Sequence, residues 1–198
     1  MSNKLNVKTS KFLTKILRHD ALNLGLVIDE NGFIELNKIL NIDYFKKNNI
    51  TIEFIKKLVE NCSKKRFNLI LKDSKYYIAA NQGHSIKINS NLLRKITLEN
   101  THLFPNVIHG TYKKNLDSIL KNGLNKMSRI HIHFTTECDN KKVISGMRSS
   151  CNVFIHMNLC KLIEDGYEFY ISQNNVILSP GNKDGIIDPK YFLKVVSI

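Results

Sequence analysis

Arginine is rare among the basic residues of this chain, and its few positions mark candidate contacts to phosphate or carboxylate. Of the 30 basic side chains, only five are arginine: Arg18, Arg66, Arg94, Arg129 and Arg148. The planar guanidinium presents a fork of N–H donors that can hold two oxygens at once, which a lysine ammonium cannot do. Any single one of these arginines could equally be an ordinary surface residue, so their neighbours decide the interpretation.

Histidines gather in two short segments of the second half of the chain. His109 lies in the run 107–111, and His131 and His133 follow Arg129 at every second position. Because alternate residues of a strand share one face, Arg129, His131 and His133 are expected to project together. One buried histidine is most often a hydrogen-bonded core residue, but three of them beside an arginine favour a polar site.

Zinc binding is the competing interpretation of these histidines, since imidazole is a good ligand. Two histidines two residues apart, without Asp, Glu or Cys at ligand spacing, make a poor metal site. The cysteines form no CxxC pair either; they are Cys62, Cys138, Cys151 and Cys160. We therefore expect no bound metal and no disulfide framework. The sequence also lacks the glycine-rich motifs of Rossmann and P-loop nucleotide sites.

These residues need elements to position them, and the first half predicts helices followed by a hairpin. Apolar residues at helical spacing predict three helices, over 10–18 with Ser10 as N-cap, over 36–40 and over 52–60. The runs 66–71 and 76–80, joined by 72–75, predict a β-hairpin. Together these elements predict a small winged-helix-like lobe.

The second half predicts a lobe rich in β-structure. The segment 89–100 is polar and weakly patterned, so we place a boundary near residue 95, giving lobes 1–95 and 96–198. Apolar runs then predict six short strands, at 106–109, 130–135, 153–157, 167–171, 176–178 and 191–195. One helix is expected among them, over 113–121. The fold class is therefore predicted to be α+β.

Charge is distributed unevenly between the two halves. The chain of 198 residues carries a net charge of +13, and residues 1–97 contribute +10 of it. A strongly basic half predicts a polyanionic partner, most often nucleic acid, although lysine-rich faces are also common as plain solvated surface. The sequence contains no apolar run long enough to span a membrane and no signal core, so we expect a cytoplasmic protein.

Six segments, in this order, resemble the successive motifs of the tRNA/RNA 2′-phosphotransferase family: 10–20, 24–33, 80–85, 109–111, 127–133 and 174–179. The resemblance implies an N-terminal RNA-binding lobe of winged-helix type and a C-terminal lobe of ADP-ribosyltransferase type that binds NAD as co-substrate. It also implies action on RNA with an internal 2′-phosphate, as in a spliced tRNA. We expect a monomer, and the oligomeric state stays open. The physiological RNA stays open.

The implied reaction has two steps. The RNA 2′-phosphate attacks C1″ of the NAD ribose and expels nicotinamide. The ribose 2″-OH then attacks the phosphorus, which releases RNA with a free 2′-OH and ADP-ribose 1″,2″-cyclic phosphate. By resemblance, the catalytic set is Arg18, His19, Arg66 and Arg129. Three guanidiniums could hold the phosphate oxygens, and the histidine could relay a proton.

The resemblance also implies residues for NAD and for the RNA. His109, Gly110 and Thr111 match the NAD signature, in which the histidine contacts ribose hydroxyls and the glycine allows close approach of the nicotinamide amide. The remaining NAD candidates are His131, His133 and Arg148, and which of the two histidines faces NAD stays open. The resemblance implies that the RNA candidates would sit between the lobes: Gln82, Gly83, His84 and Ser85.

The chain departs from the family pattern at three places. Ala21 and Leu22 stand where a proline usually follows the Arg-His pair, and the pattern around residues 145–152 is reduced to Gly146 and Arg148. Asn175 replaces a glycine in the late motif. None of these departures touches the four catalytic candidates, but they leave the details of the loop near Arg148 open.

Two other classes of function remain as alternatives. An ADP-ribosyltransferase that modifies protein or nucleic acid commonly carries a glutamate on a late strand, whereas 174–179 contains no carboxylate. A winged-helix nucleic-acid-binding protein without activity explains the basic first half. It does not explain Arg129 and the histidines that follow it.

Overall fold

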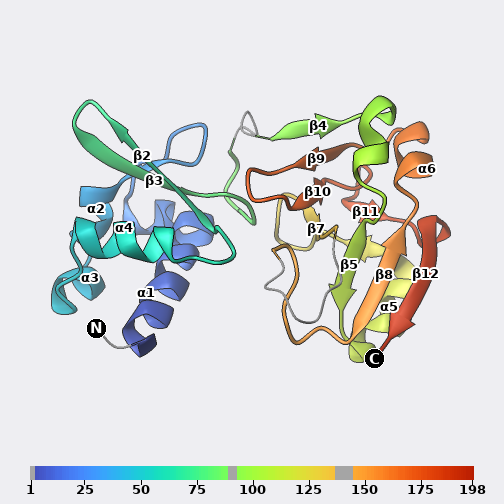
Figure 1. The fold of residues 1–198 in the computed structure, drawn as a ribbon, viewed down its shortest axis with the longest axis horizontal. Helices are drawn as coiled ribbons and strands as arrows, with labels where there is room; N and C mark the ends of the chain where they lie inside the picture. Colours follow the sequence, from blue (N-terminus) through green and yellow to red (C-terminus); the bar gives the residue numbers. More distant parts are fainter. Residues whose placement is uncertain (1–2, 89–92, 137–144) are drawn as a thin grey trace. The chain divides into compact units, whose positions relative to one another are not determined.

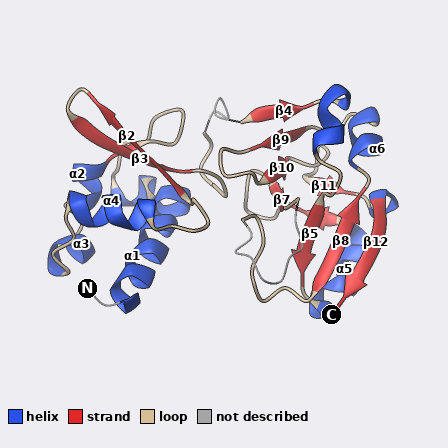
Figure 2. Ribbon diagram, in the orientation of Figure 1, coloured by secondary structure: helices blue, strands red, loops and turns tan. Residues whose placement is uncertain are grey.

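A computed structural model describes residues 3–88, 93–136 and 145–198, and it divides the chain into two compact units, Met1–Asn91 and Leu92–Ile198 (Figure 1). Helices and several small sheets occur together, so the predicted α+β class is confirmed (Figure 2). The division falls four residues before the boundary predicted near residue 95. Among the residues described, every helix is too short or too polar to cross a bilayer.

The first unit begins with a helix that is longer than predicted. Helix α1 spans Asn3–Lys15 and continues as a π-helical turn over Ile16–Asp20. The prediction that Ser10 caps this helix is wrong: Ser10 lies inside it, and its carbonyl accepts a hydrogen bond from Thr14 Oγ1 at 2.7 Å. The polar segment before Ser10 is helical because Leu5 packs against the core and Thr9 is buried.

The remaining elements of the first unit follow the predicted order. The two predicted helices α2 (Leu36–Leu40) and α4 (Ile52–Glu60) are confirmed, and α3 (Asp43–Lys47) lies between them without having been predicted. A three-stranded antiparallel sheet has the order β1 (Ile34–Glu35), β3 (Lys75–Ala80), β2 (Phe67–Lys72). Its predicted hairpin turns at Asp73 and Ser74, whose φ angles of 48° and 60° match a type I′ turn.

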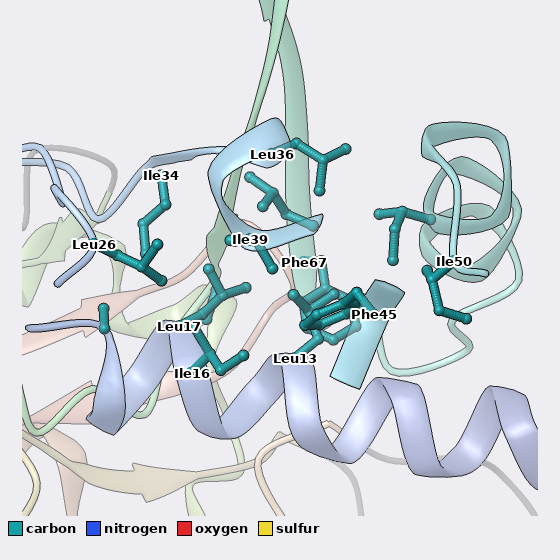
Figure 3. Close-up of a cluster of buried hydrophobic side chains, with 14 of the residues drawn as sticks. Leu13, Ile16, Leu17, Leu26, Ile34, Leu36, Ile39, Phe45, Ile50 and Phe67 are labelled. Carbon is teal, nitrogen blue, oxygen red and sulfur yellow. The ribbon is translucent and has the colours of Figure 1, made fainter. Parts of the chain in front are cut away.

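A buried cluster fixes the end of α1 in this unit. Leu13, Ile16 and Leu17 are fully buried and face apolar residues from α2, α3 and the hairpin, among them Ile39, Phe45 and Phe67 (Figure 3). Two of the five residues of the π-helical turn therefore lie in the core. Their burial sets the position of Arg18 and His19, which follow them directly.

The second unit contains three sheets and two α-helices among the described residues. One sheet has the order β4 (Arg94–Ile96), β9 (Phe169–Ile171), β10 (Ile177–Ser179), β7 (Ile132–Phe134). Another has the order β12 (Phe192–Ser197), β8 (Val153–Met157), β5 (Ile108–Thr111), and β11 (Ile186–Ile187) pairs with β6 (Leu124–Asn125). The helices are α5 (Lys113–Asn122), as predicted, and α6 (Leu159–Glu164), which contradicts the expectation of a single helix.

A backbone bridge joins the two larger sheets where the histidines lie. The amide N–H of Ile108 donates to the carbonyl of Thr135, and the amide of Thr135 donates back to the carbonyl of Ile108, both at 2.9 Å. This antiparallel bridge places the start of β5 against the end of β7. His109 and His133 are therefore brought close together from segments 24 residues apart.

Candidate active site

In the first unit, the loop after β3 holds the end of the first helix. Arg18 Nη2 donates to Oε1 of Gln82 at 3.0 Å, and the amide of Ser85 donates to the carbonyl of Arg18 at 2.9 Å. The Nδ1 of His19 and the hydroxyl of Ser85 are hydrogen-bonded at 2.9 Å. Two predicted catalytic residues and two predicted RNA-contact residues therefore form one hydrogen-bonded group.

Gly83 lies against the guanidinium of Arg18. Its φ of 89° is in the left-handed region, and a Cβ there would lie 3.0 Å from Nη1 of Arg18. Only glycine therefore leaves this arginine undisturbed. The fourth RNA candidate, His84, is buried at 4% exposure, and its ring approaches the position that a Cβ on Gly32 would occupy. The structure places His84 inside the fold, beside the turn at residues 29–32.

Arg66 is tied to the same loop through the backbone. It directly precedes β2 and is half-buried, and its carbonyl accepts a hydrogen bond from the amide of Asn81 at 2.9 Å. Its Nη1 donates to Sγ of Cys62 at 3.5 Å. Since Asn81 is followed by Gln82, one short loop positions both Arg66 and Arg18. The loop 81–85 thus orients the guanidinium of Arg18 and the imidazole of His19, and it fixes the backbone from which the side chain of Arg66 projects.

In the second unit, His109 is neutral and its tautomer is fixed. Its Nδ1 lies 3.0 Å from the carbonyl oxygen of His133, and because a carbonyl can only accept, Nδ1 carries the proton. Burial lowers the pKa of His109 below its usual value, and the positive charge of Arg129 lowers this pKa further. The Nε2 of His109 is therefore an acceptor, which suits a hydroxyl group of a ligand.

The neighbours of His109 on β5 are tightly packed. A Cβ on Gly110 would collide with the side chain of Met147 and would lie 3.2 Å from Sγ of Cys151. Thr111 is buried, and its hydroxyl accepts a hydrogen bond from Nδ2 of Asn115 at 3.4 Å. Because Gly110 has no side chain, another group can lie directly against the backbone of β5 there. In this structure the flexible side chain of Met147 occupies that space.

The expectation that Arg129, His131 and His133 project from one strand is wrong. The strand β7 spans only Ile132–Phe134, and Arg129 and His131 lie in the bend that precedes it. Arg129 is exposed there, and its amide donates to the carbonyl of Lys126 at 3.2 Å. Residues 129–131 form a bend and not a strand because the neighbouring strand β10 ends at Ser179, opposite Ile132. No further residue of β10 is therefore available to pair with them.

The two histidines of this segment have different surroundings. His133 is buried on β7 opposite Leu178, while the ring of His131 meets Tyr170 of β9 edge to face with centroids 6.2 Å apart. Burial, helped by the charge of Lys126, lowers the pKa of His131 to about 4. Both His131 and His109 are therefore uncharged at neutral pH.

Arg129 and Arg148 form the positive part of this unit's site. Arg129 is exposed as a whole, but burial around its guanidinium lowers the pKa of this side chain, and the nearby charge of Arg148 lowers this pKa further. Two guanidiniums close enough to repel each other favour an anion between them, such as a pyrophosphate. A neutral histidine with a free acceptor beside such a pair fits the ribose and pyrophosphate of a dinucleotide.

Three residues near these groups were not predicted from the sequence. They are Cys62 beside Arg66, Met147 over Gly110 and Tyr170 beside His131. For Tyr170 the only sequence signal was the strand predicted over 167–171, in which alternate side chains point to opposite faces. In the part of the chain described, no three His, Cys, Asp or Glu side chains are grouped as a metal ion would require.

Comparison with known proteins assigns this arrangement to a family. The model of the family described as RNA 2′-phosphotransferase, Tpt1/KptA family, matches residues 4–181. The tRNA 2′-phosphotransferase 1 of Danio rerio is 35% identical over 190 residues, covering 94% of this chain and 84% of that protein. The "Probable RNA 2′-phosphotransferase" of Flavobacterium johnsoniae is 35% identical over 191 residues, covering 96% and 97%.

A Schizosaccharomyces pombe protein named for tRNA 2′-phosphotransferase activity is 41% identical over 190 residues. The match covers 96% of this chain but only 51% of that protein. The chain therefore spans about half the length of this relative.

Proposed function

The chain belongs to the RNA 2′-phosphotransferase family, and from this premise we propose that it transfers an internal RNA 2′-phosphate to NAD. The observation that carries the proposal is the loop 81–85, whose Gln82 and Ser85 bond Arg18 and His19 and whose Asn81 donates a hydrogen bond to the backbone carbonyl of Arg66. Two arginines and a histidine with fixed partners suit a phosphate that is already part of the substrate. The first unit is proposed as the winged-helix-like, RNA-binding lobe.

The second unit is proposed as the NAD-binding, ADP-ribosyltransferase-like lobe. Its support is the chemistry of the donor set. The neutral His109 offers Nε2 as an acceptor to a ribose hydroxyl, and the charged pair Arg129 and Arg148 suits the pyrophosphate. Met147 would have to swing away from Gly110 for the nicotinamide amide to approach the backbone there.

The first chemical step forms a bond between a 2′-phosphate oxygen and C1″ of the NAD ribose and breaks the bond to nicotinamide. Arg18 and Arg66 hold and orient the phosphate for this attack. Because Arg18 and Arg66 are already fixed by their own partners, little ordering is left to do when the RNA binds.

The second step forms a bond between the ribose 2″-oxygen and phosphorus and breaks the bond between phosphorus and the RNA 2′-oxygen. Negative charge accumulates on the phosphorus oxygens, and the arginines stabilise it. In this proposal His19 moves the proton from the attacking hydroxyl toward the leaving 2′-oxygen. Its hydrogen bond to Ser85 holds the ring in one orientation.

The strand β10 gives no support to the alternative function, in which the protein ADP-ribosylates a protein or another site of a nucleic acid. β10 (Ile177–Ser179) carries no carboxylate, and the segment before it is occupied by an internal network in which Ser172 Oγ donates to Asn174 Oδ1 at 2.8 Å. An acceptor that brings its own phosphate nucleophile needs no such carboxylate. The proposal therefore stays with RNA 2′-phosphate.

The proposal is tested by incubating the protein with NAD and a short RNA that bears one internal 2′-phosphate. We expect loss of the RNA phosphate together with nicotinamide and ADP-ribose 1″,2″-cyclic phosphate, identified by mass spectrometry. Arg18→Ala should abolish this turnover, whereas Arg94→Ala, which removes an exposed arginine of β4, should not. Release of inorganic phosphate without any need for NAD would overturn the proposal.

A further inference from the structure

A groove of about 910 Å³ lies between α1 and α4 in the first unit. Asn6, Ser10 and Thr14 line it from α1, and Lys57 lines it from α4. Arg66, one of the proposed phosphate ligands, is also part of its wall. This volume is at the upper end of the range of ligand pockets, so the groove has room for more than the single phosphate that Arg66 would hold.

The rim of the groove is positively charged. Lys11, Lys57 and Arg66 line it, against the single carboxylate of Glu53. Lys11 also belongs to a stripe along one face of α1, because exposed lysines recur there with the spacing of a heptad: Lys4, Lys8, Lys11 and Lys15. Lys15 is paired with Asp20 at 2.7 Å, and Lys11 is the member of this stripe that lines the groove.

The walls combine polar side chains with an exposed apolar side chain. Ser10 and Asn6 supply hydroxyl and amide groups, while Val7 is 49% exposed within the same groove. A polyanion with sugar hydroxyls and flat apolar bases matches this mixture better than an acidic peptide does, since RNA is bound through phosphates, 2′-hydroxyls and base faces.

We propose that this groove binds the single RNA strand that flanks the nucleotide carrying the 2′-phosphate. The inference rests on the proposed function, because Arg66, which is proposed there to hold the 2′-phosphate, also lines the groove. From Asn6 to Thr14 the helix rises about 12 Å at 1.5 Å per residue. A stacked strand advances about 3.4 Å per nucleotide, so the groove accommodates roughly three to four flanking nucleotides.

The test compares two substrates and two double variants. The substrates are a dinucleotide with one internal 2′-phosphate and a single-stranded RNA with the same modified step and six further nucleotides on each side. Lys11→Gln with Lys57→Gln removes two charges from the groove. Lys46→Gln with Lys47→Gln removes two exposed lysines from α3, outside the groove, as the matched control.

We expect the groove variant to raise KM for the long RNA by about five- to tenfold, because two phosphate contacts are lost. Its turnover of the dinucleotide should stay at the wild-type level, and the control variant should change neither substrate. Glu53→Gln should act in the opposite direction and lower KM for the long RNA. Thermal unfolding of each variant checks that the fold is retained.

Unchanged KM of the long RNA in the groove variant, with normal turnover by the wild type, would overturn the inference and leave the proposed function standing. A wild type that does not use NAD with the dinucleotide would instead overturn the proposed function. A fluorescent poly-glutamate peptide serves as the competing ligand. If that peptide binds the wild type more tightly than an RNA of equal charge that lacks the 2′-phosphate, and loses affinity in the groove variant, the groove is a protein site and the inference is wrong.

Discussion

The guanidinium of Arg18 is held by the side chain of Gln82, whose Oε1 accepts from Nη2 at 3.0 Å. The two residues are 64 positions apart, and the bond links the π-helical end of the first helix to the loop that follows the hairpin. Arg18 is thereby oriented before any substrate is bound. Such orientation lowers the entropic cost of placing a reacting phosphate.

Replacement of Gln82 tests whether this orientation matters. Gln82→Ala removes the acceptor and leaves Arg18 free to move, so we expect kcat on the 2′-phosphorylated RNA to fall by about tenfold. The free energy of unfolding should change by only about 1 kcal/mol, the usual net value of one hydrogen bond. Steady-state kinetics and thermal unfolding measure the two effects. A large loss of stability with unchanged kcat would show that Gln82 is merely structural.

Substitution of arginine by lysine separates the two chemical steps. Arg66→Lys and Arg129→Lys keep the charge but lose the fork that holds two oxygens. If these arginines mainly stabilise the charge of the second step, nicotinamide release continues and RNA joined through its 2′-phosphate to ADP-ribose accumulates. A lost contact of about 3–4 kcal/mol slows that step roughly 10²–10³-fold. Gel electrophoresis of the RNA detects the species, and wild-type turnover by Arg129→Lys would contradict its role.

His109 is expected to act in the first chemical step, before the RNA–ADP-ribose species forms. His109→Ala removes the acceptor offered to the ribose and the hydrogen bond to the carbonyl of His133, so the first step itself should fail. We expect a raised KM for NAD, little nicotinamide release and no RNA–ADP-ribose species. His102→Ala, which changes an exposed histidine elsewhere in the second unit, is the control. Accumulation of the joined species in His109→Ala would assign this histidine to the second step.

Acid should destabilise the second unit through His131. Its pKa lies near 4 in the folded protein and near 6.5 in the unfolded chain, so the unfolded chain binds the proton first as pH falls. Stability is therefore lost between about pH 6.5 and pH 4. The full shift corresponds to roughly 3 kcal/mol. His131→Gln should reduce the difference in Tm between pH 7 and pH 5, and an unchanged difference would refute the assignment.

Salt should separate the two proposed ligands. Residues 1–97 carry +10 of the net charge of +13, so RNA affinity should fall steeply as ionic strength rises. The affinity for NAD, which carries little charge, should hardly change. Fluorescence anisotropy with labelled RNA and calorimetry with NAD, each at low and at physiological salt, give the two slopes. RNA binding that is insensitive to salt would remove the first unit from its proposed role.

The sequence predicted those elements whose signals are local. α4 has both its apolar spacing and a threonine cap, since Thr51 Oγ1 accepts from the amide of Phe54, and its predicted bounds are confirmed. The start of α1 was misplaced because Ser10 looks like a cap in sequence, whereas burial of Thr9 and packing of Leu5 extend the helix beyond it.

The site was less predictable than the elements, because its geometry depends on pairing between distant segments. The strand at residues 130–135 is shortened by where β10 ends, so Arg129 falls in a bend that no local pattern indicates. Met147 over Gly110 likewise joins residues 37 positions apart. The family motifs named residues for the roles, but only the fold shows that Ser85 bonds His19 and that Asn81 bonds the backbone of Arg66.

The loop at residues 81–85 also has a consequence for the synthesis of the protein. Arg18 and His19 leave the ribosome early, but their partners Gln82 and Ser85 are made more than 60 residues later. Closing so long a segment costs chain entropy that only the completed hairpin and its buried core can offset. A nascent chain that ends before residue 81 therefore holds an arginine and a histidine without the groups that orient them. The phosphate-holding group becomes one of the last parts of the first unit to form.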